Sequence, residues 1–310
     1  MAGSVLRLGT RGSLLALTQS RWVAAQLQRR CPDVRVELRI VTTSGDKAAD
    51  QPLRDVGGKG LFTKEIEQAL LAREVDLAVH SLKDVPVTMP LVAQEDLVIE
   101  AIPPREDPRD ALVSLGADSI EALPAGARVG TTSLRRRCQL LAARPDLRIE
   151  PLRGNIDTRL RKLREGQFDA VVLAMAGLRR TGLFDAGYMV ALEPELMLPA
   201  PGQGALALQC RRDDQATRRI LAMMNDGDTA RCVRAERRVV ELLGGDCHSP
   251  IAALANMAGD MLVLDVAVGR RDGMPPVFRA RAKAADAETA ASDVHASLEA
   301  QGAVASPGRE

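Results

Sequence analysis

A lysine and an aspartate stand side by side in the segment His80-Ser-Leu-Lys-Asp-Val-Pro86. The segment follows Val75–Val79, a mostly apolar stretch that predicts a buried strand. Because α/β folds place ligands and reacting groups at the carboxyl ends of strands, Asp84 could move a proton or stabilise a cationic intermediate there. A salt bridge between Lys83 and Asp84 that merely ends the strand is an equally good interpretation.

Two glycine-containing segments predict contacts with anions. In Gly9-Thr-Arg-Gly-Ser13, Ser13 can cap a following helix whose first N–H groups attract an anion, and Arg11 adds a guanidinium fork. In Val56-Gly-Gly-Lys-Gly-Leu-Phe62, glycines surround Lys59 and make a loop that can bring its ammonium to an anionic ligand. The spacing is not that of a phosphate-binding P-loop. A capped helix with a solvated arginine and a turn without function are the alternatives.

Arginines crowd the middle of the chain. Residues 128–180 hold 12 arginines and one lysine against five acidic residues, a surplus of eight positive charges in a chain whose net charge is +1. Three segments deliver arginines close to a loop or a helix start: Ser133–Gln139, Leu152–Arg159 and Gly177–Arg180. One such cluster is usually a solvated face, whereas three that converge on one rim would bind several carboxylates or phosphates. Nucleic acid is another possible ligand, but six aromatic residues offer few stacking surfaces.

Cys247 lies in a predicted turn, flanked by Gly244, Gly245 and Pro250. A cysteine in a loop with small neighbours can be exposed and reactive. Single cysteines are more often structural, and the neighbouring Asp246 disfavours a thiolate. From these residues alone, the structural interpretation is favoured.

Composition limits the classes of protein that the chain can belong to. Its 310 residues are enough for two or three domains, and 46% hydrophobic with 27% charged residues is typical of a globular protein. No stretch is long enough to span a membrane, and no secretory signal precedes Thr10. Five scattered cysteines and three histidines without ligand-like spacing argue against a disulfide framework and a zinc site. We therefore expect a cytoplasmic protein without a metal.

Strand-like and helix-like stretches alternate along the chain. The first hundred residues predict a parallel or mixed sheet with helices on both faces, including a helix over Leu14–Arg30 with Leu14, Leu17, Trp22 and Leu27 in the core. A second α/β block follows from about Arg109 to Leu198. It contains predicted strands at 127–130 and 169–174 and predicted helices at 134–143 and 157–165.

Two proline-containing linkers, Ile102–Pro108 and Leu198–Gly204, separate the blocks. The apolar run Ala205–Gln209 could then return to the first lobe as an added strand. The two blocks echo each other, because a Gly-Thr pair and a serine open a helix in both. Two similar lobes joined by two crossings predict a ligand-binding cleft. A third, smaller α+β block has a helix over 229–243, a strand over 261–269 and a helix over 286–299.

Taken in order, seven segments of this sequence resemble the porphobilinogen deaminase family over nearly the whole chain, to about Ile251. They are Gly9–Ser13, Val56–Phe62, Ala78–Pro86, Arg105–Asp110, Gly130–Arg136, Leu152–Asn155 and Leu198–Gly204. The resemblance implies two lobes like those of periplasmic binding proteins and a C-terminal domain that anchors a cofactor. On this basis we expect a first domain of residues 1–103 and 204–222, a second of 104–203 and a third of 223–310.

The resemblance also implies an activity. Members of the family join four porphobilinogen molecules head to tail, release ammonia and give the linear tetrapyrrole hydroxymethylbilane for porphyrin and haem biosynthesis. They are primed by a covalent dipyrromethane, and its thioether anchor matches Cys247, which reverses the structural interpretation of that cysteine. The catalytic aspartate of the family matches Asp84.

Each pyrrole unit carries an acetate and a propionate. The resemblance therefore implies that the arginines bind these carboxylates. The positions that match cofactor-binding residues, besides Asp84 and Cys247, are Lys83, Thr131, Ser133, Arg135, Arg136 and Arg159. The positions that match substrate-binding residues are Arg11, Ser13, Lys59, Arg153, Arg159 and Arg180. In two places the chain departs from the family pattern, with Asp55 before Val-Gly-Gly-Lys and Asp246 before the anchor cysteine.

The expected partners are therefore porphobilinogen and the growing polypyrrole chain, bound by a monomer without nucleic acid or membrane. A hinged binding protein for a dicarboxylate is the main alternative. It would use the same arginines and cleft but would need neither Asp84 nor Cys247. A nucleic-acid-binding module is the other alternative, and its affinity would depend strongly on salt.

Overall fold

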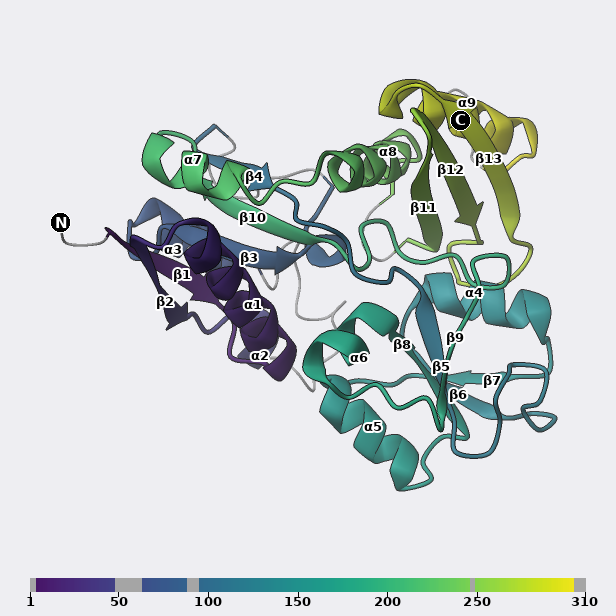
Figure 1. The fold of residues 1–310 in the computed structure, drawn as a ribbon. Coiled ribbons are helices and arrows are strands. Elements are labelled where there is room, and N and C mark those ends of the chain that lie inside the picture. The colour runs from purple at the N-terminus through teal and green to yellow at the C-terminus, as the bar shows by residue number, and fades with distance from the viewer. Residues whose placement is uncertain (1–3, 48–62, 88–94, 246–248, 304–310) are drawn as a thin grey trace. The chain divides into compact units, whose positions relative to one another are not determined.

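The computed structural model describes residues 4–47, 63–87, 95–245 and 249–303 (Figure 1). The chain forms two compact units, residues 1–106 with 205–230, and residues 107–204 with 231–310. The division into three domains and the cleft between lobes stay predictions.

The first unit is built on a five-stranded sheet of order β2-β1-β3-β10-β4. Strand β1 runs parallel to β2 and β3, whereas β10 runs antiparallel to both of its neighbours, β3 and β4. Its elements are β1 (Ser4–Thr10), α1 (Leu14–Arg30), β2 (Val34–Ile40), α2 (Ser44–Lys47), α3 (Lys64–Leu71), β3 (Leu77–Ser81), the 3-10 turn η1 (Leu82–Asp84), β4 (Leu97–Ala101), β10 (Leu206–Arg211) and α7 (Gln215–Ala222).

Helix α1 has the predicted bounds but not the predicted core face. Leu27 is fully buried, whereas Leu14 and Trp22 are 46% and 39% exposed, so their placement in the core was wrong. The buried face instead includes Gln19 and Ser20, whose side chains donate to Ser81 Oγ and Thr10 Oγ1 at the ends of β3 and β1. The helix meets the strand ends through polar groups there, which hydrophobic periodicity does not detect.

The sheet of the second unit, of order β7-β6-β8-β5-β9, repeats the arrangement of the first. Strand β6 runs parallel to β7 and β8, and β5 runs antiparallel to β8 and β9. The elements are β5 (Asp110–Val113), β6 (Arg128–Gly130), α4 (Leu134–Ala143), β7 (Arg148–Glu150), α5 (Ile156–Arg164), β8 (Ala170–Ala174), α6 (Met175–Thr181) and β9 (Met189–Ala191). In both sheets the antiparallel fourth strand follows a crossing segment, residues 102–108 before β5 and residues 198–204 before β10. The predicted return of Ala205–Gln209 to the first sheet is confirmed by β10.

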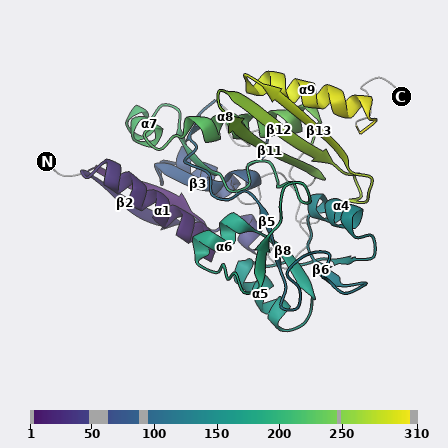
Figure 2. The ribbon, with the colours of Figure 1, turned by 45° about the vertical axis from the view of Figure 1, so that its right-hand side comes forward.

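A smaller α+β part completes the second unit. Helix α8 (Gly227–Leu242), whose first turn still belongs to the first unit, leads into an antiparallel sheet of β11 (Ile251–Ala258), β12 (Met261–Val268) and β13 (Phe278–Ala284). Helix α9 (Ala287–Ala300) packs along this sheet (Figure 2). The predicted fold class, α/β lobes with a smaller C-terminal α+β part, is confirmed.

The burial of α1 predicts unequal costs for two truncations on that helix. Leu27→Ala should lower the free energy of unfolding by about 2–5 kcal/mol, because it leaves a cavity in a fully buried site. Trp22→Ala removes a larger but partly exposed side chain and should cost clearly less. Urea unfolding followed by circular dichroism measures both, and a larger loss for Trp22→Ala would contradict the placement of this face.

Candidate active site

The junction of β1 with α1 opens a pocket in the first unit. Ser13 caps α1, and its Oγ accepts a hydrogen bond of 3.3 Å from the N–H of Ala16. The pocket is lined by Arg11, Ser13, Leu15, Ala16, Gln19, Thr63, Ile66, Val79, His80, Ser81 and Asp84. The structure therefore brings three of the predicted site residues, Arg11, Ser13 and Asp84, to the wall of one pocket.

Asp84 reaches this pocket because β3 ends in a tight turn. Leu82 is buried and donates its N–H to Ala205 O, at 3.0 Å, just before β10 begins. Val85 closes the turn by donating its N–H to Leu82 O. Lys83 and Asp84 stand on this anchored turn, Lys83 half-buried and Asp84 exposed. The turn thus presents a carboxylate at the carboxyl end of a buried strand, as the sequence predicted.

A buried polar chain, His80–Gln209–Glu67, leads inward from the pocket. His80 Nε2 lies 2.9 Å from Gln209 Oε1, and Gln209 Nε2 donates to Glu67 Oε1 at 2.9 Å. All three residues are buried, and burial lowers the pKa of His80 to about 4 against the opposing effect of the Gln209 hydrogen bond. His80 is therefore neutral near pH 7. Sequence reasoning assigned His80 no role, because Gln209 is 129 residues away along the chain.

In the second unit, the junction of β6 with α4 repeats that of β1 with α1. Ser133 caps α4, its Oγ accepting from the N–H of Arg136, and its own N–H donates to Thr131 Oγ1. A side chain at Gly130 would stand 3.0 Å from both Leu152 and Phe168, so the end of β6 packs closely against its neighbours. Thr131 and Ser133 are thereby fixed at a helix N-terminus.

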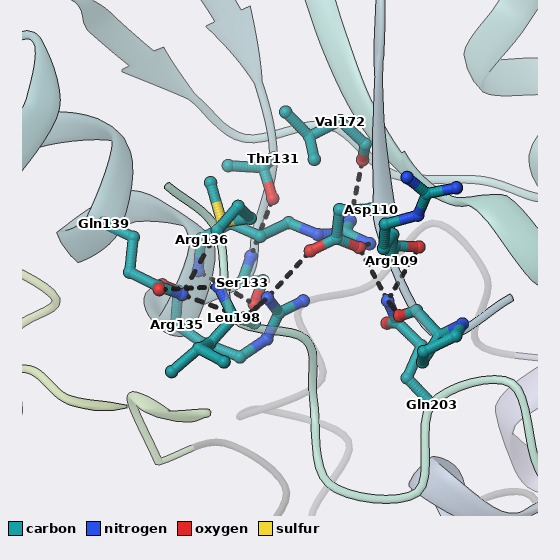
Figure 3. Close-up of polar contacts among 12 residues, drawn as sticks. Arg109, Asp110, Thr131, Ser133, Arg135, Arg136, Gln139, Val172, Leu198 and Gln203 are labelled. Carbon is teal, nitrogen blue, oxygen red and sulfur yellow. Dashed lines mark hydrogen bonds and ion pairs between the residues drawn. The ribbon is translucent and has the colours of Figure 1, made fainter. Parts of the chain in front are cut away.

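Arg135 and Arg136, on the first turn of α4, are buried and bind a buried carboxylate (Figure 3). Arg135 Nη1 donates to Asp110 Oδ2 at 2.8 Å, and Arg136 Nη2 donates to Asp110 Oδ1 at 2.7 Å. Burial alone would raise the pKa of Asp110, but the two guanidiniums hold it well below its ordinary range. No sequence pattern indicated a role for Asp110, whose partner Arg135 is 25 residues away along the chain.

The other predicted arginines lie on neighbouring loops and helices of the second unit. Arg159, on α5, donates through Nε to Gly154 O at 2.8 Å, and Gly154 takes a φ of +109° that favours glycine. Arg153 is half-buried in the loop before α5. Arg180, on α6, donates to Gly204 O at 2.8 Å. Lys59 and Cys247 lie outside the described residues.

Neither a metal centre nor a membrane span emerges from the described part of the chain. No three His, Cys, Asp or Glu side chains there gather closely enough to hold a metal ion. No helix among these residues is long and apolar enough to cross a membrane.

Comparison with protein families decides the relationship. Residues 6–219 match the family model described as "Porphobilinogen deaminase, dipyromethane cofactor binding domain", and residues 230–300 match "Porphobilinogen deaminase, C-terminal domain". The chain belongs to the porphobilinogen deaminase family.

Relatives within the porphobilinogen deaminase family match almost end to end. The porphobilinogen deaminase of Acidithiobacillus ferrooxidans is 51% identical over 298 residues, 96% of this chain and 95% of that protein. That of Syntrophobacter fumaroxidans is 52% identical over 280 residues, 90% and 89% of the two chains. Among solved structures, an arginine periplasmic binding protein from Legionella pneumophila matches with a TM-score of 0.40 and 13% identity, over 71% of this chain and 91% of that one.

The second unit offers donors that fit the carboxylates of the family's dipyrromethane. Arg136 Nε is a buried N–H without a hydrogen-bond partner in the described part of the chain. The hydrogen bonds of Arg135 to described residues all use Nη1, so its Nε and Nη2 edge, which suits a carboxylate bidentately, remains. The residues present therefore fit an anionic group at this helix start.

The neutral, buried His80 predicts a pH dependence of stability. Its pKa in the folded chain lies below the unfolded value of 6.5, so the unfolded chain binds more protons between about pH 6.5 and 4. Stability should fall as the pH drops through this range, by up to about 1.4 kcal/mol per pH unit from this residue. His80→Gln should lose that part of the slope. Urea unfolding at pH 7, 6 and 5 measures it, and equal slopes would refute the assignment.

Proposed function

We propose that this protein is a hydroxymethylbilane synthase, a transferase that joins four porphobilinogen molecules head to tail for porphyrin and haem biosynthesis. Ammonia leaves at each addition, and water releases the tetrapyrrole at the end. Membership of the porphobilinogen deaminase family supports this activity. The observation that carries it is the pocket of the first unit, where Asp84 stands with the cation Arg11 and the helix cap Ser13.

Asp84 is the proposed catalytic residue. When porphobilinogen loses ammonia, it leaves an electron-poor methylene-pyrrolenine, and Asp84 stabilises the resulting pyrrolic N–H cation and helps to move its proton. The anchored turn at the end of β3 fixes Asp84 before the substrate arrives. Cys247 would hold the dipyrromethane as a thioether, and the group would supply, when bound, the terminal pyrrole carbon to which the first unit is joined.

The cations hold the acetate and propionate groups of the pyrroles. We assign this task to Arg11, Lys59, Lys83, Arg135, Arg136, Arg153, Arg159 and Arg180. Ser13, Thr131 and Ser133 complete it at two helix N-termini, where N–H groups favour an anion. Guanidinium forks bind carboxylates bidentately, which positions each ring as well as neutralising its charge.

The proposal also covers the oligomeric state, the compartment and the domains of the protein. The chain works as a cytoplasmic monomer on porphobilinogen and the growing polypyrrole, without nucleic acid or membrane. Cys31, Cys138 and Cys210 are free thiols, which fits a reducing compartment. Residues 1–103 with 204–222 and residues 104–203 form the two lobes of the binding cleft, and residues 223–310 anchor the cofactor.

Replacement of the proposed catalytic carboxylate separates the enzyme from a binding protein. Asp84→Asn should lower kcat about 10²- to 10⁴-fold, because the amide neither stabilises the cation nor accepts the proton. Asp33→Asn, at an exposed position of the same unit, should retain full activity. Steady-state assays measure both. If Asp84→Asn keeps its turnover, the assignment fails. If the wild-type chain binds porphobilinogen without consuming it, the binding-protein alternative holds.

The cofactor anchor is tested by intact mass. The purified wild-type protein should exceed its sequence mass by two linked pyrrole units, because the thioether to Cys247 survives purification. Cys247→Ser should carry no excess, whereas Cys31→Ser, at a half-buried cysteine without an assigned role, should keep it. An excess that persists in Cys247→Ser would place the anchor elsewhere.

A further inference from the structure

One buried carboxylate serves two buried arginines in the second unit. Asp110, the first residue of β5, is completely buried. Besides the two guanidiniums, Gln203 donates to it from Nε2 at 2.9 Å (Figure 3). The same amide donates to Pro108 O at 2.7 Å. Asp110 is therefore held in place from the crossing segment 198–204 as well as from α4.

Each of the two arginines, Arg135 and Arg136, uses only some of its guanidinium N–H groups to bind Asp110 and nearby carbonyl oxygens. Arg135 uses Nη1 for both Asp110 and Leu198 O. Arg136 uses Nη2 for Asp110 and Nη1 for Val172 O. Arg136 Nε is buried without a partner among the described residues. The side-chain hydrogen bonds of Arg135 to described residues use Nη1 alone, which leaves its Nε–Nη2 edge. The fixed atoms set the direction in which these remaining donors point.

A comparable cluster in the first unit has one carboxylate for each guanidinium, although Arg211 Nε there is, like Arg136 Nε, a buried N–H without a partner among the described residues. There Asp76 accepts from both Arg7 and Arg211, and Arg211 also pairs with Asp214 at 2.9 Å. Two carboxylates thus serve two guanidiniums. Among the described residues, Arg135 and Arg136 share the single carboxylate of Asp110. The Asp110 cluster therefore carries a net positive charge among these residues. Because a buried cation without a counter-ion is costly, one further carboxylate would stabilise it.

We propose that Asp110 is a positioning residue for polypyrrole binding, which holds Arg135 and Arg136 so that their remaining donors receive a carboxylate of the bound pyrroles. The inference rests on the proposed function and adds Asp110 to its machinery. Asp110 does not touch the pyrroles; it acts through the two arginines. Gln203 supports it from the crossing segment.

The test exploits the sign of the effect. Asp110→Asn removes a negative charge beside a binding site for anions, so electrostatics alone predicts tighter substrate binding. Loss of positioning predicts weaker substrate binding. Without the Asp110 charge, the guanidiniums of Arg135 and Arg136 repel each other and move away from the positions in which they bind a carboxylate. We expect the cofactor-loaded Asp110→Asn enzyme to show a KM for porphobilinogen raised about tenfold or more, since small misplacements of binding groups cost that much. Asp110→Glu, which keeps the charge, should recover part of the loss.

Asp76→Asn is the matched control, because it also removes a carboxylate shared by two arginines. It should lose stability in urea while its KM stays at the wild-type value. A KM that falls in Asp110→Asn, or one that stays unchanged while stability drops as in Asp76→Asn, overturns the proposal. If Asp110→Asn does not fold, Asp110→Glu decides: an unchanged KM overturns the proposal and a severalfold rise supports it. Failure of the proposed function would show separately, as a wild-type chain that does not consume porphobilinogen.

Discussion

Each five-stranded sheet depends on a strand that arrives from a crossing segment. Strand β10 lies between β3 and β4, β5 lies between β8 and β9, and every residue of both strands is buried. Neither sheet can bury its centre without this strand. The first sheet is completed only by residues 206–211, more than a hundred residues after β4 ends. The fold of the first unit is therefore tied to a non-local pairing, the kind that forms slowly.

The same two strands also bring buried polar groups to the strand ends that carry the proposed site. Strand β10 supplies Gln209, which bonds His80 beside the turn of Asp84. Strand β5 supplies Asp110, which bonds the arginines at the start of α4. In both units, one antiparallel strand thus completes the sheet. It also supplies a buried side chain that hydrogen-bonds a residue at the end of a neighbouring strand or at the start of the helix that follows. Because such groups are costly to bury unpaired, the pairing also specifies the register of the inserted strand.

What the sequence could predict was local. The bounds of α1 and α4 follow from a capping serine and helical periodicity within one segment, and the structure reproduces both. The short strands β5 and β9, of four and three residues, show no period and were not predicted, whereas the equally short β6 was predicted at 127–130. The core face of α1 was misjudged at Leu14 and Trp22, because polar contacts of Gln19 and Ser20 replace apolar ones there.

The residues of the proposed site also fall into those that local motifs predict and those that depend on distant partners. Asp84, Arg11 and Ser13 could be placed from motifs, since each stands at the end of its own strand or the start of its own helix. Asp110 and Gln209 could not, although Asp110 lies within a segment that supported the family resemblance. Their roles depend on partners 25 and 129 residues away along the chain, and a single sequence carries no local signal for such contacts.

The crossing segment, residues 198–204, is held by two of the arginines that we assign to carboxylate binding and by one buried glutamate. Arg135 donates to Leu198 O, Arg180 donates to Gly204 O, and the buried Glu236 accepts from the N–H of Gly202 at 2.6 Å. A guanidinium that holds main chain through one nitrogen has already lost its freedom before a ligand arrives. The side-chain entropy is then lost on folding and not on ligand binding. The binding free energy of a carboxylate at that guanidinium is more favourable as a result. The backbone that joins the two units therefore also preorganises the arginines for a substrate that gains two carboxylates with every unit added.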